Sequence, residues 1–181
     1  MKTINKGLLV LFAVTLIMAP SFDTEAKAKT TYRYTTQTVK LAKGVTVRRN
    51  TRVKLLDKGK VRSLIEYKGK PYVTKTKWLH KEKSPRKYTP KQFRWGGIIR
   101  WHGCTFTYYS QRVLPGGGLK IPGRHVDKRG FVCDKDGYIV IASTVNMKKK
   151  HAVVATPFGK FGKVYDCGAG SSKWRDVYVN W

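Results

Sequence analysis

Residues 162–168 (GKVYDCG) and residues 175–179 (RDVYV) decide the fold of the C-terminal half of the chain. Both stretches are rich in β-branched and aromatic side chains, which predicts two β-strands. Residues 167–173 join them and are mostly small, a composition that lets two backbones or a ligand approach closely. The sequence therefore predicts two strands connected by a tight loop.

Acidic side chains mark the end of the first stretch and the start of the second. Side chains alternate between the faces of a strand, so the two valines of RDVYV share one face and Asp176, Tyr178 and Asn180 share the other. If the valines face the core, Asp176 points into a groove beside an aromatic ring and an amide, which suits a sugar. In the alternative interpretation, Asp166 and Asp176 each cap a turn by accepting backbone hydrogen bonds.

The rest of the chain also has the pattern of short strands separated by glycine or proline turns, and residues 31–81 contain no convincing helical periodicity. We therefore predict an all-β protein. Further strands are expected at residues 32–34, 44–48, 61–67, 72–73, 138–142 and 152–154.

Residues 82–92 contain two prolines, four cations and no apolar periodicity, which is typical of a linker. This linker would separate a small module at residues 29–81 from a second domain at residues 93–181. Residues 108–118 end in three glycines and predict a long loop beside the groove.

Residues 1–28 have the composition of a secretory signal peptide. Lys2 and Lys6 precede an apolar stretch at residues 8–18, Pro20 follows it, and residues 26–28 (AKA) offer the small residues of a cleavage site. We expect the exported chain to begin near Lys29, with no transmembrane segment left. An uncleaved membrane anchor is the alternative.

The chain is strongly cationic, with 38 Lys and Arg against 10 Asp and Glu and a formal net charge of +28. Outside a bacterial cell, this charge favours a polyanionic partner such as wall teichoic acid, anionic lipid or shed nucleic acid. The lysines are spread over the whole chain, which argues against a pore-forming helix. In the alternative interpretation the charge serves solubility alone.

Three cysteines lie in the second half: Cys104, Cys133 and Cys167. An oxidising compartment permits one disulfide, with three pairings open, and Cys133 with Cys167 is favoured because both flank predicted strands. A catalytic thiol is disfavoured, since none of the three lies in a recognisable nucleophile motif.

No metal or cofactor is predicted. Residues 134–137 (DKDG) resemble the start of a calcium loop, but the later acidic ligands are missing, which favours a turn before the next strand. Asp127 lies in a basic loop, where pairing with Lys128 or Arg129 explains it.

Two family resemblances add to this interpretation. Residues 40–47 (KLAKGVTV) and 72–79 (YVTKTKWL) look like the bacterial SH3-like wall-binding module. Residues 139–142 (IVIA), 156–159 (TPFG), 162–168 and 175–179 resemble the double-psi β-barrel of the three-aspartate (3D) family, related to rare lipoprotein A, membrane-bound lytic transglycosylase A and the expansins. The second resemblance covers residues 137–181 and implies a six-stranded double-psi β-barrel.

In the lytic transglycosylases of this group, the aspartate that matches Asp176 is the single catalytic acid. The resemblance thus implies that Asp176 is the acid and base and that Asp166 is its orienting partner. The chain departs from the pattern twice: the third aspartate aligns with Ser143 or Thr144, and Cys167 replaces a threonine. A dense cationic surround would also lower the pKa of a carboxyl group, which works against a general acid.

The leading hypothesis is a secreted enzyme that cleaves peptidoglycan glycan strands, in wall remodelling or in bacteriolysis. The second is an expansin-like or adhesive wall-binding protein without catalysis, in which Tyr178, Trp174 and Trp181 stack on sugars beside Asn180. The third is a nucleic-acid binder driven by charge alone, without specific recognition.

Overall fold

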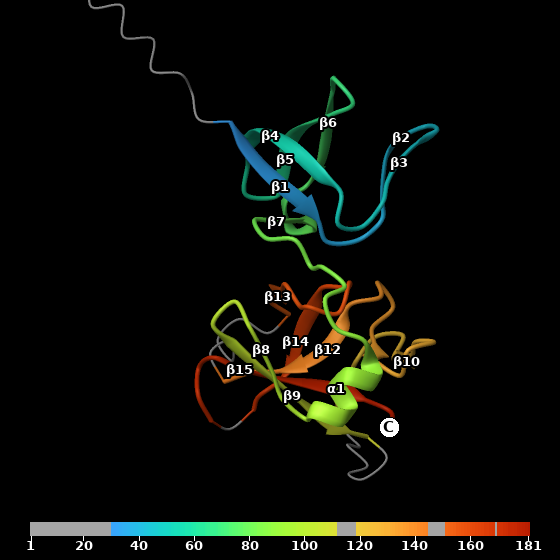
Figure 1. The fold of residues 1–181 in the computed structure, drawn as a ribbon. Coiled ribbons are helices and arrows are strands. Elements are labelled where there is room, and N and C mark those ends of the chain that lie inside the picture. Colours follow the sequence, from blue (N-terminus) through green and yellow to red (C-terminus); the bar gives the residue numbers. More distant parts are fainter. Residues whose placement is uncertain (1–29, 112–118, 145–150, 169) are drawn as a thin grey trace, which may run out of the picture.

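A computed structural model of the chain describes residues 30–111, 119–144, 151–168 and 170–181. The predicted signal peptide and most of the glycine-rich loop lie outside these residues. The described residues form two β-rich bodies, one above the other in Figure 1, with a single α-helix in the second. The prediction of an all-β protein is confirmed. Within the described residues, no helix has the length and apolar character that a membrane crossing requires.

The N-terminal module contains a five-stranded antiparallel sheet in the order β6-β5-β4-β1-β7, and a separate hairpin of β2 and β3. Its small core is centred on Val47, Val53 and Ile65. The elements are β1 (Thr31–Thr35), β2 (Val39–Ala42), β3 (Val45–Val47), β4 (Arg52–Lys58), β5 (Arg62–Tyr67), β6 (Lys70–Lys75), the 3-10 turn η1 (Thr76–Trp78) and β7 (Leu79–His80).

The C-terminal domain contains an eight-stranded sheet, not the six strands expected. Its main path is β10-β11-β12-β15-β9-β8, with β14 on β12 and β13 on β14. The strands are β8 (Ile99–Trp101), β9 (Cys104–Ser110), β10 (His125–Val126), β11 (Val132–Cys133), β12 (Ile139–Ala142), β13 (Val153–Val154), β14 (Gly162–Asp166) and β15 (Trp174–Val179). Residues 108–110, predicted as loop, belong to β9, which pairs in parallel with β15.

Core residues cover both faces of the central strands. The valines of β15 and two isoleucines of β12 belong to the main core, as the alternation predicted. Tyr178 on the opposite face is also buried, in a second cluster with Val140, Ala142 and Tyr165. A strand covered on both faces reads as a continuous apolar run, which explains the sequence IVIA at β12. The face of β15 that carries Tyr178 is therefore not an open groove along its whole length.

The segment at residues 82–92 is not a free linker. Ser84 is fully buried, and its hydroxyl donates to the carbonyls of Thr156 at 2.7 Å and Lys160 at 2.6 Å. The end of the segment enters α1 (Pro90–Gly96), where Thr89 and Gln92 form a capping box with Pro90 in the first turn. Residues 89–92 (TPKQ) have the pattern of a helix N-terminus, but the prolines of the segment favoured its interpretation as a linker.

The expected disulfide between Cys133 and Cys167 is not formed, and all three cysteines are thiols. Cys133 is buried in the main core, where its Sγ lies 3.6 Å from the Nζ of Lys160, whereas Cys167 is exposed after β14. The Cys133 side chain is therefore in the core and the Cys167 side chain is at the surface, so the two sulfur atoms do not meet. Burial raises the pKa of the Cys133 thiol to about 11, so this thiol stays protonated.

Candidate functional site

The ends of β12, β14 and β15 bring Asp166 and Asp176 to the two sides of one residue. Ala142 of β12 is the register partner of Asp166 in the parallel ladder and of Asp176 in the antiparallel ladder. The parallel ladder shifts its register between Ile141 and Ala142, so that Asp166, and not Tyr165, is the partner of Ala142. Both aspartates lie beside Ala142, and the charge of Asp166 acts on Asp176.

Asp166 is held by three contacts. Its Oδ2 accepts a 2.6 Å hydrogen bond from the Tyr178 hydroxyl, and its Oδ1 accepts one of 2.7 Å from the Cys167 amide. Its backbone carbonyl accepts from the Ser143 amide at 3.1 Å. Burial raises the pKa of Tyr178 and the Asp166 hydrogen bond raises it further, so the phenol remains a donor. Asp166 thus accepts a backbone hydrogen bond, as the turn-capping interpretation predicted, and it also lies near Asp176.

Asp176 is the carboxyl group with the unusual environment. Its Oδ1 accepts a 2.9 Å hydrogen bond from the Thr107 hydroxyl of β9. Burial raises the pKa of Asp176, the Thr107 hydrogen bond opposes that effect, and the nearby charge of Asp166 raises the pKa again. The net direction is upward. The sequence-based expectation that surrounding cations lower this pKa is wrong, because no cation is among the groups that shift it.

Asp176 opens into a hollow of about 130 Å³ at the surface. Trp174 flanks it with 46% of its surface exposed. Ser143, one of the two residues aligned with the third aspartate, is buried and accepts a 3.0 Å hydrogen bond from Arg175. The hollow is lined by hydroxyl, aromatic and carboxyl side chains together with small residues: Thr107, Ala142, Ser143, Thr144, Gly168, Trp174 and Asp176.

Three predicted sugar-contacting residues do not line this hollow. Tyr178 is buried and its ring lies 4.8 Å from that of Tyr109. Asn180 accepts a 2.8 Å hydrogen bond from Gln111. Trp181 packs edge-on against Phe131 in the main core, with ring centroids 5.5 Å apart. The aromatic platform of the binding hypothesis is therefore reduced to Trp174.

Sequence reasoning missed Thr107, because the pairing of β9 with β15 joins residues 69 positions apart. It also missed the depth of Asp134, which is fully buried, binds Lys163 and accepts a 2.7 Å hydrogen bond from Tyr165. The turn predicted at residues 134–137 is present, with Asp134 accepting from the amides of Asp136 and Tyr138. Among the described residues, no cluster of His, Cys, Asp and Glu could hold a metal ion.

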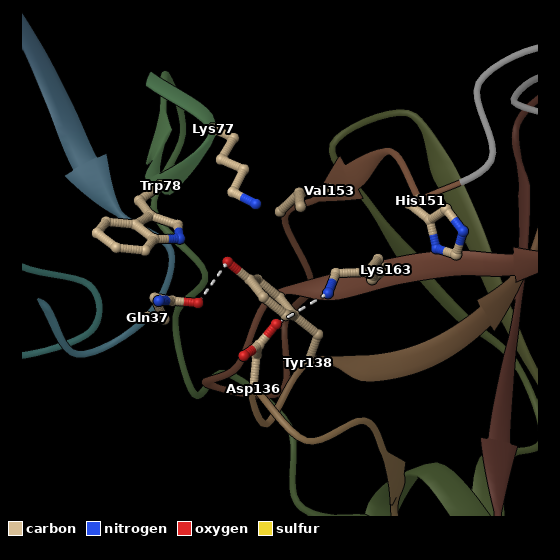
Figure 2. Close-up of a pocket in the computed structure, with 8 residues that line it drawn as sticks. All are labelled: Gln37, Lys77, Trp78, Asp136, Tyr138, His151, Val153 and Lys163. Atoms are coloured by element: carbon tan, nitrogen blue, oxygen red, sulfur yellow. Dashed lines mark hydrogen bonds and ion pairs between the residues drawn. The ribbon is translucent and has the colours of Figure 1, made fainter. Parts of the chain in front are cut away.

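A second hollow of about 250 Å³ lies between the two bodies (Figure 2). The N-terminal module contributes Gln37, Lys77 and Trp78. On the other side, the Tyr138 hydroxyl donates to Gln37 at 3.3 Å, and Lys163 pairs with the exposed Asp136 at 3.4 Å. This hollow is larger than the one at Asp176 and has an aromatic wall.

Comparison of the chain with known protein families, with curated proteins and with solved structures gives no match.

Proposed function

We propose that the protein is exported to the bacterial cell wall and cleaves glycan strands of peptidoglycan, with Asp176 as the only acid and base. The observation that carries the proposal is a partly buried carboxyl group, with its pKa raised, inside a hollow beside an exposed tryptophan. An acid of this kind stays protonated to a higher pH than an ordinary aspartate, which a general acid requires. Trp174 offers the apolar face on which a sugar ring stacks.

The proposed step is a lyase reaction within the sugar. Protonated Asp176 gives its proton to the glycosidic oxygen as the bond from C1 to that oxygen breaks. The hydroxyl oxygen at C6 of the same sugar then bonds to C1, and the Asp176 carboxylate accepts the hydroxyl proton. The products are a 1,6-anhydro sugar and a new free chain end. Water is not consumed, so the second carboxylate of a hydrolase is not needed.

Asp166 acts in this scheme as a positioning residue. The Tyr178 hydroxyl and the Cys167 amide fix its carboxylate, so its negative charge stays at a constant place relative to Asp176. That charge raises the pKa of Asp176 and keeps the proton on the acid. The domain at residues 93–181 would be the double-psi barrel of the three-aspartate family, and residues 29–81 the SH3-like module that attaches it to the wall.

A second function, binding without cleavage, is favoured by one observation. Ser143 and Thr144, the two residues aligned with the third aspartate, carry no carboxyl group, and the Arg175 guanidinium donates to the Ser143 hydroxyl. A hollow with Trp174, hydroxyl groups and one carboxyl group could hold a sugar as an expansin-like or adhesive protein would. Only cleavage releases new fragments from the glycan strand, so one experiment separates the two functions.

The test is incubation of the purified protein with peptidoglycan, followed by mass spectrometry of the released fragments. We expect 1,6-anhydro-muropeptides from the wild type and a loss of at least about 100-fold in Asp176→Asn, the usual size of a general-acid contribution. Asp136→Asn is the matched control, since this exposed carboxyl group lies outside the hollow. Pelleting with peptidoglycan without anhydro products would establish the binding function. Activity that survives in Asp176→Asn would refute the assigned acid.

A further inference from the structure

A cationic hollow lies on the N-terminal module, far along the chain from Asp176. Its volume is about 240 Å³. No acidic residue lines it, and its three cations, Lys40, Arg62 and Lys75, are exposed. None of these cations forms an ion pair with another of the described residues. The remaining lining residues are Val73, Thr74 and Trp78.

The fold places these like charges next to one another. Arg62 of β5 and Lys75 of β6 are direct register partners in the antiparallel ladder. Lys40 joins them because β2 contacts β6. Like charges directly opposed across two strands destabilise a sheet. An anion bound between them would remove that repulsion, so the arrangement favours a ligand with negative charge.

The side chain of Thr74 faces the opposite side of β6 from Lys75. It is 95% buried, and its hydroxyl has no hydrogen-bond partner within the described residues. A buried hydroxyl without a partner costs free energy unless a ligand or water satisfies it. Thr74 is the register partner of buried Ser63, so its hydroxyl points into the module and does not contact an anion between Arg62 and Lys75.

Trp78 connects this hollow to the one between the two bodies, since it lines both. The Nζ of Lys75 lies 4.9 Å from the centre of its ring. On the far side, Figure 2 shows Lys77 at the mouth of the junction hollow, where Lys163 is already paired with Asp136. Cations therefore lie on both sides of one tryptophan, with Lys77 the uncompensated one at the junction.

We infer that this surface, hereafter the Trp78 track, binds a polymer of phosphodiesters separated by polyol units. One phosphate lies between Arg62, Lys75 and Lys40. The polyol that follows packs its C–H groups on Trp78, and the next phosphate pairs with Lys77. Alternation of charge and apolar surface in the protein matches the alternation in such a polymer, whereas a neutral glycan would leave the cations without partners.

The experiment is isothermal titration of the full-length exported protein with synthetic poly(glycerol phosphate) at physiological salt. We expect Arg62→Ala/Lys75→Ala and Trp78→Ala each to weaken binding about tenfold, in line with the loss of charge-assisted contacts. Lys91→Ala/Lys128→Ala removes the same charge from exposed positions of the other domain and is the matched control, with a change below about twofold.

Equal losses in the two double variants would overturn the Trp78 track, since binding would then follow net charge alone. Unchanged affinity in Trp78→Ala would overturn it too, provided that circular dichroism shows the variant folded. Polyglutamate is the comparison polymer, and equal affinity for it would contradict recognition of phosphodiesters. Asp176→Asn binds poly(glycerol phosphate) normally in this scheme, so failure here and failure of the proposed cleavage are distinguishable.

Discussion

Asp127 and Asp176 are both partly buried aspartates, yet their surroundings act in opposite directions. Burial alone would raise the pKa of Asp127, but Lys160 at 2.6 Å and the amides of Arg129 and Phe131 outweigh it and lower the pKa. Asp176 has one hydrogen bond and a like charge nearby, so burial dominates and its pKa is raised. The surroundings of Asp127 thus favour its charged form, whereas those of Asp176 favour its neutral form.

This difference predicts opposite effects of two asparagine substitutions on the free energy of unfolding. At neutral pH both carboxylates are ionised in the unfolded chain. Ionised Asp176 is disfavoured in the fold, so Asp176→Asn should increase the free energy of unfolding slightly. Asp127→Asn should destabilise it by about 3 kcal/mol, because a nearly buried lysine loses its partner.

The pH dependence checks the sign. The stability that Asp127 provides is present above the ordinary aspartate pKa and is lost as pH falls through the lowered one. The cost of Asp176 is present above its raised pKa and vanishes below the ordinary value. Urea unfolding of wild type and both variants at pH 7 and pH 3 should therefore show differences that shrink at pH 3. Differences of equal size at both pH values would contradict the two pKa directions.

At the scale of elements, the site depends on how closely β14 approaches β12. Gly162 begins β14, and a Cβ atom there would overlap the side chain of Ile141 in the main core. Gly162→Ala should therefore destabilise the protein by about 1–3 kcal/mol, the usual effect of overpacking, and displace the strand that ends in Asp166. Chemical denaturation followed by circular dichroism measures the loss.

Gly96→Ala is the matched control for this substitution. Gly96 ends α1, has an ordinary backbone conformation, and nothing lies within 4 Å of an added Cβ. Alanine there should stabilise the helix by up to about 1 kcal/mol. If Gly162→Ala behaved like Gly96→Ala, the close packing of β14 on β12 would be refuted.

The sequence predicted those strands whose apolar runs are local, such as β5, β12 and β14, and it missed elements defined by distant partners. Strand β9 is rich in aromatic and hydroxyl residues, and its place became clear only from its pairing with β15. The two aspartates could be found in the sequence because Asp166 ends β14 and Asp176 lies close to the start of β15. The contact of Thr107 with Asp176 could not be predicted, because it depends on the pairing of β9 with β15. The burial of Tyr178 could not be predicted either, because it depends on the cluster that covers its side of β15.

At the scale of the whole molecule, the few acids of the C-terminal domain are used internally. Asp127, Asp134 and Asp136 pair with lysines, and Asp166 and Asp176 accept from Tyr178 and Thr107. The chain has 38 Lys and Arg against 10 Asp and Glu, so its acids cannot neutralise most of its cations. A polyanionic wall polymer would be attracted over the whole molecule, whereas the Trp78 track would give that attraction a defined place.

Asn50 is one of several residues that join the two bodies, together with Thr36 and Gln37, which hydrogen-bond to Tyr138. Asn50 adopts a positive φ of 64° after β3, a conformation that asparagine tolerates better than most residues. Its side-chain amide donates to the carbonyls of Ser84 at 2.8 Å and Gly159 at 3.1 Å, and its Oδ1 accepts from the Ser84 amide at 3.0 Å. Ser84 in turn bonds to Thr156, so a chain of hydrogen bonds crosses from the module to the domain.

Removal of the Asn50 side chain should uncouple the two bodies. Asn50→Ala leaves the buried Ser84 amide without its acceptor, a loss of about 1–3 kcal/mol, and adds about 1 kcal/mol for a positive φ at alanine. Asn50→Gly loses the same hydrogen bonds without the backbone strain, so it should be the more stable variant by that difference. In calorimetry, the wild type should melt in one transition and both variants in two, with the smaller module first. A single unshifted transition in Asn50→Ala would show that the junction does not depend on this residue.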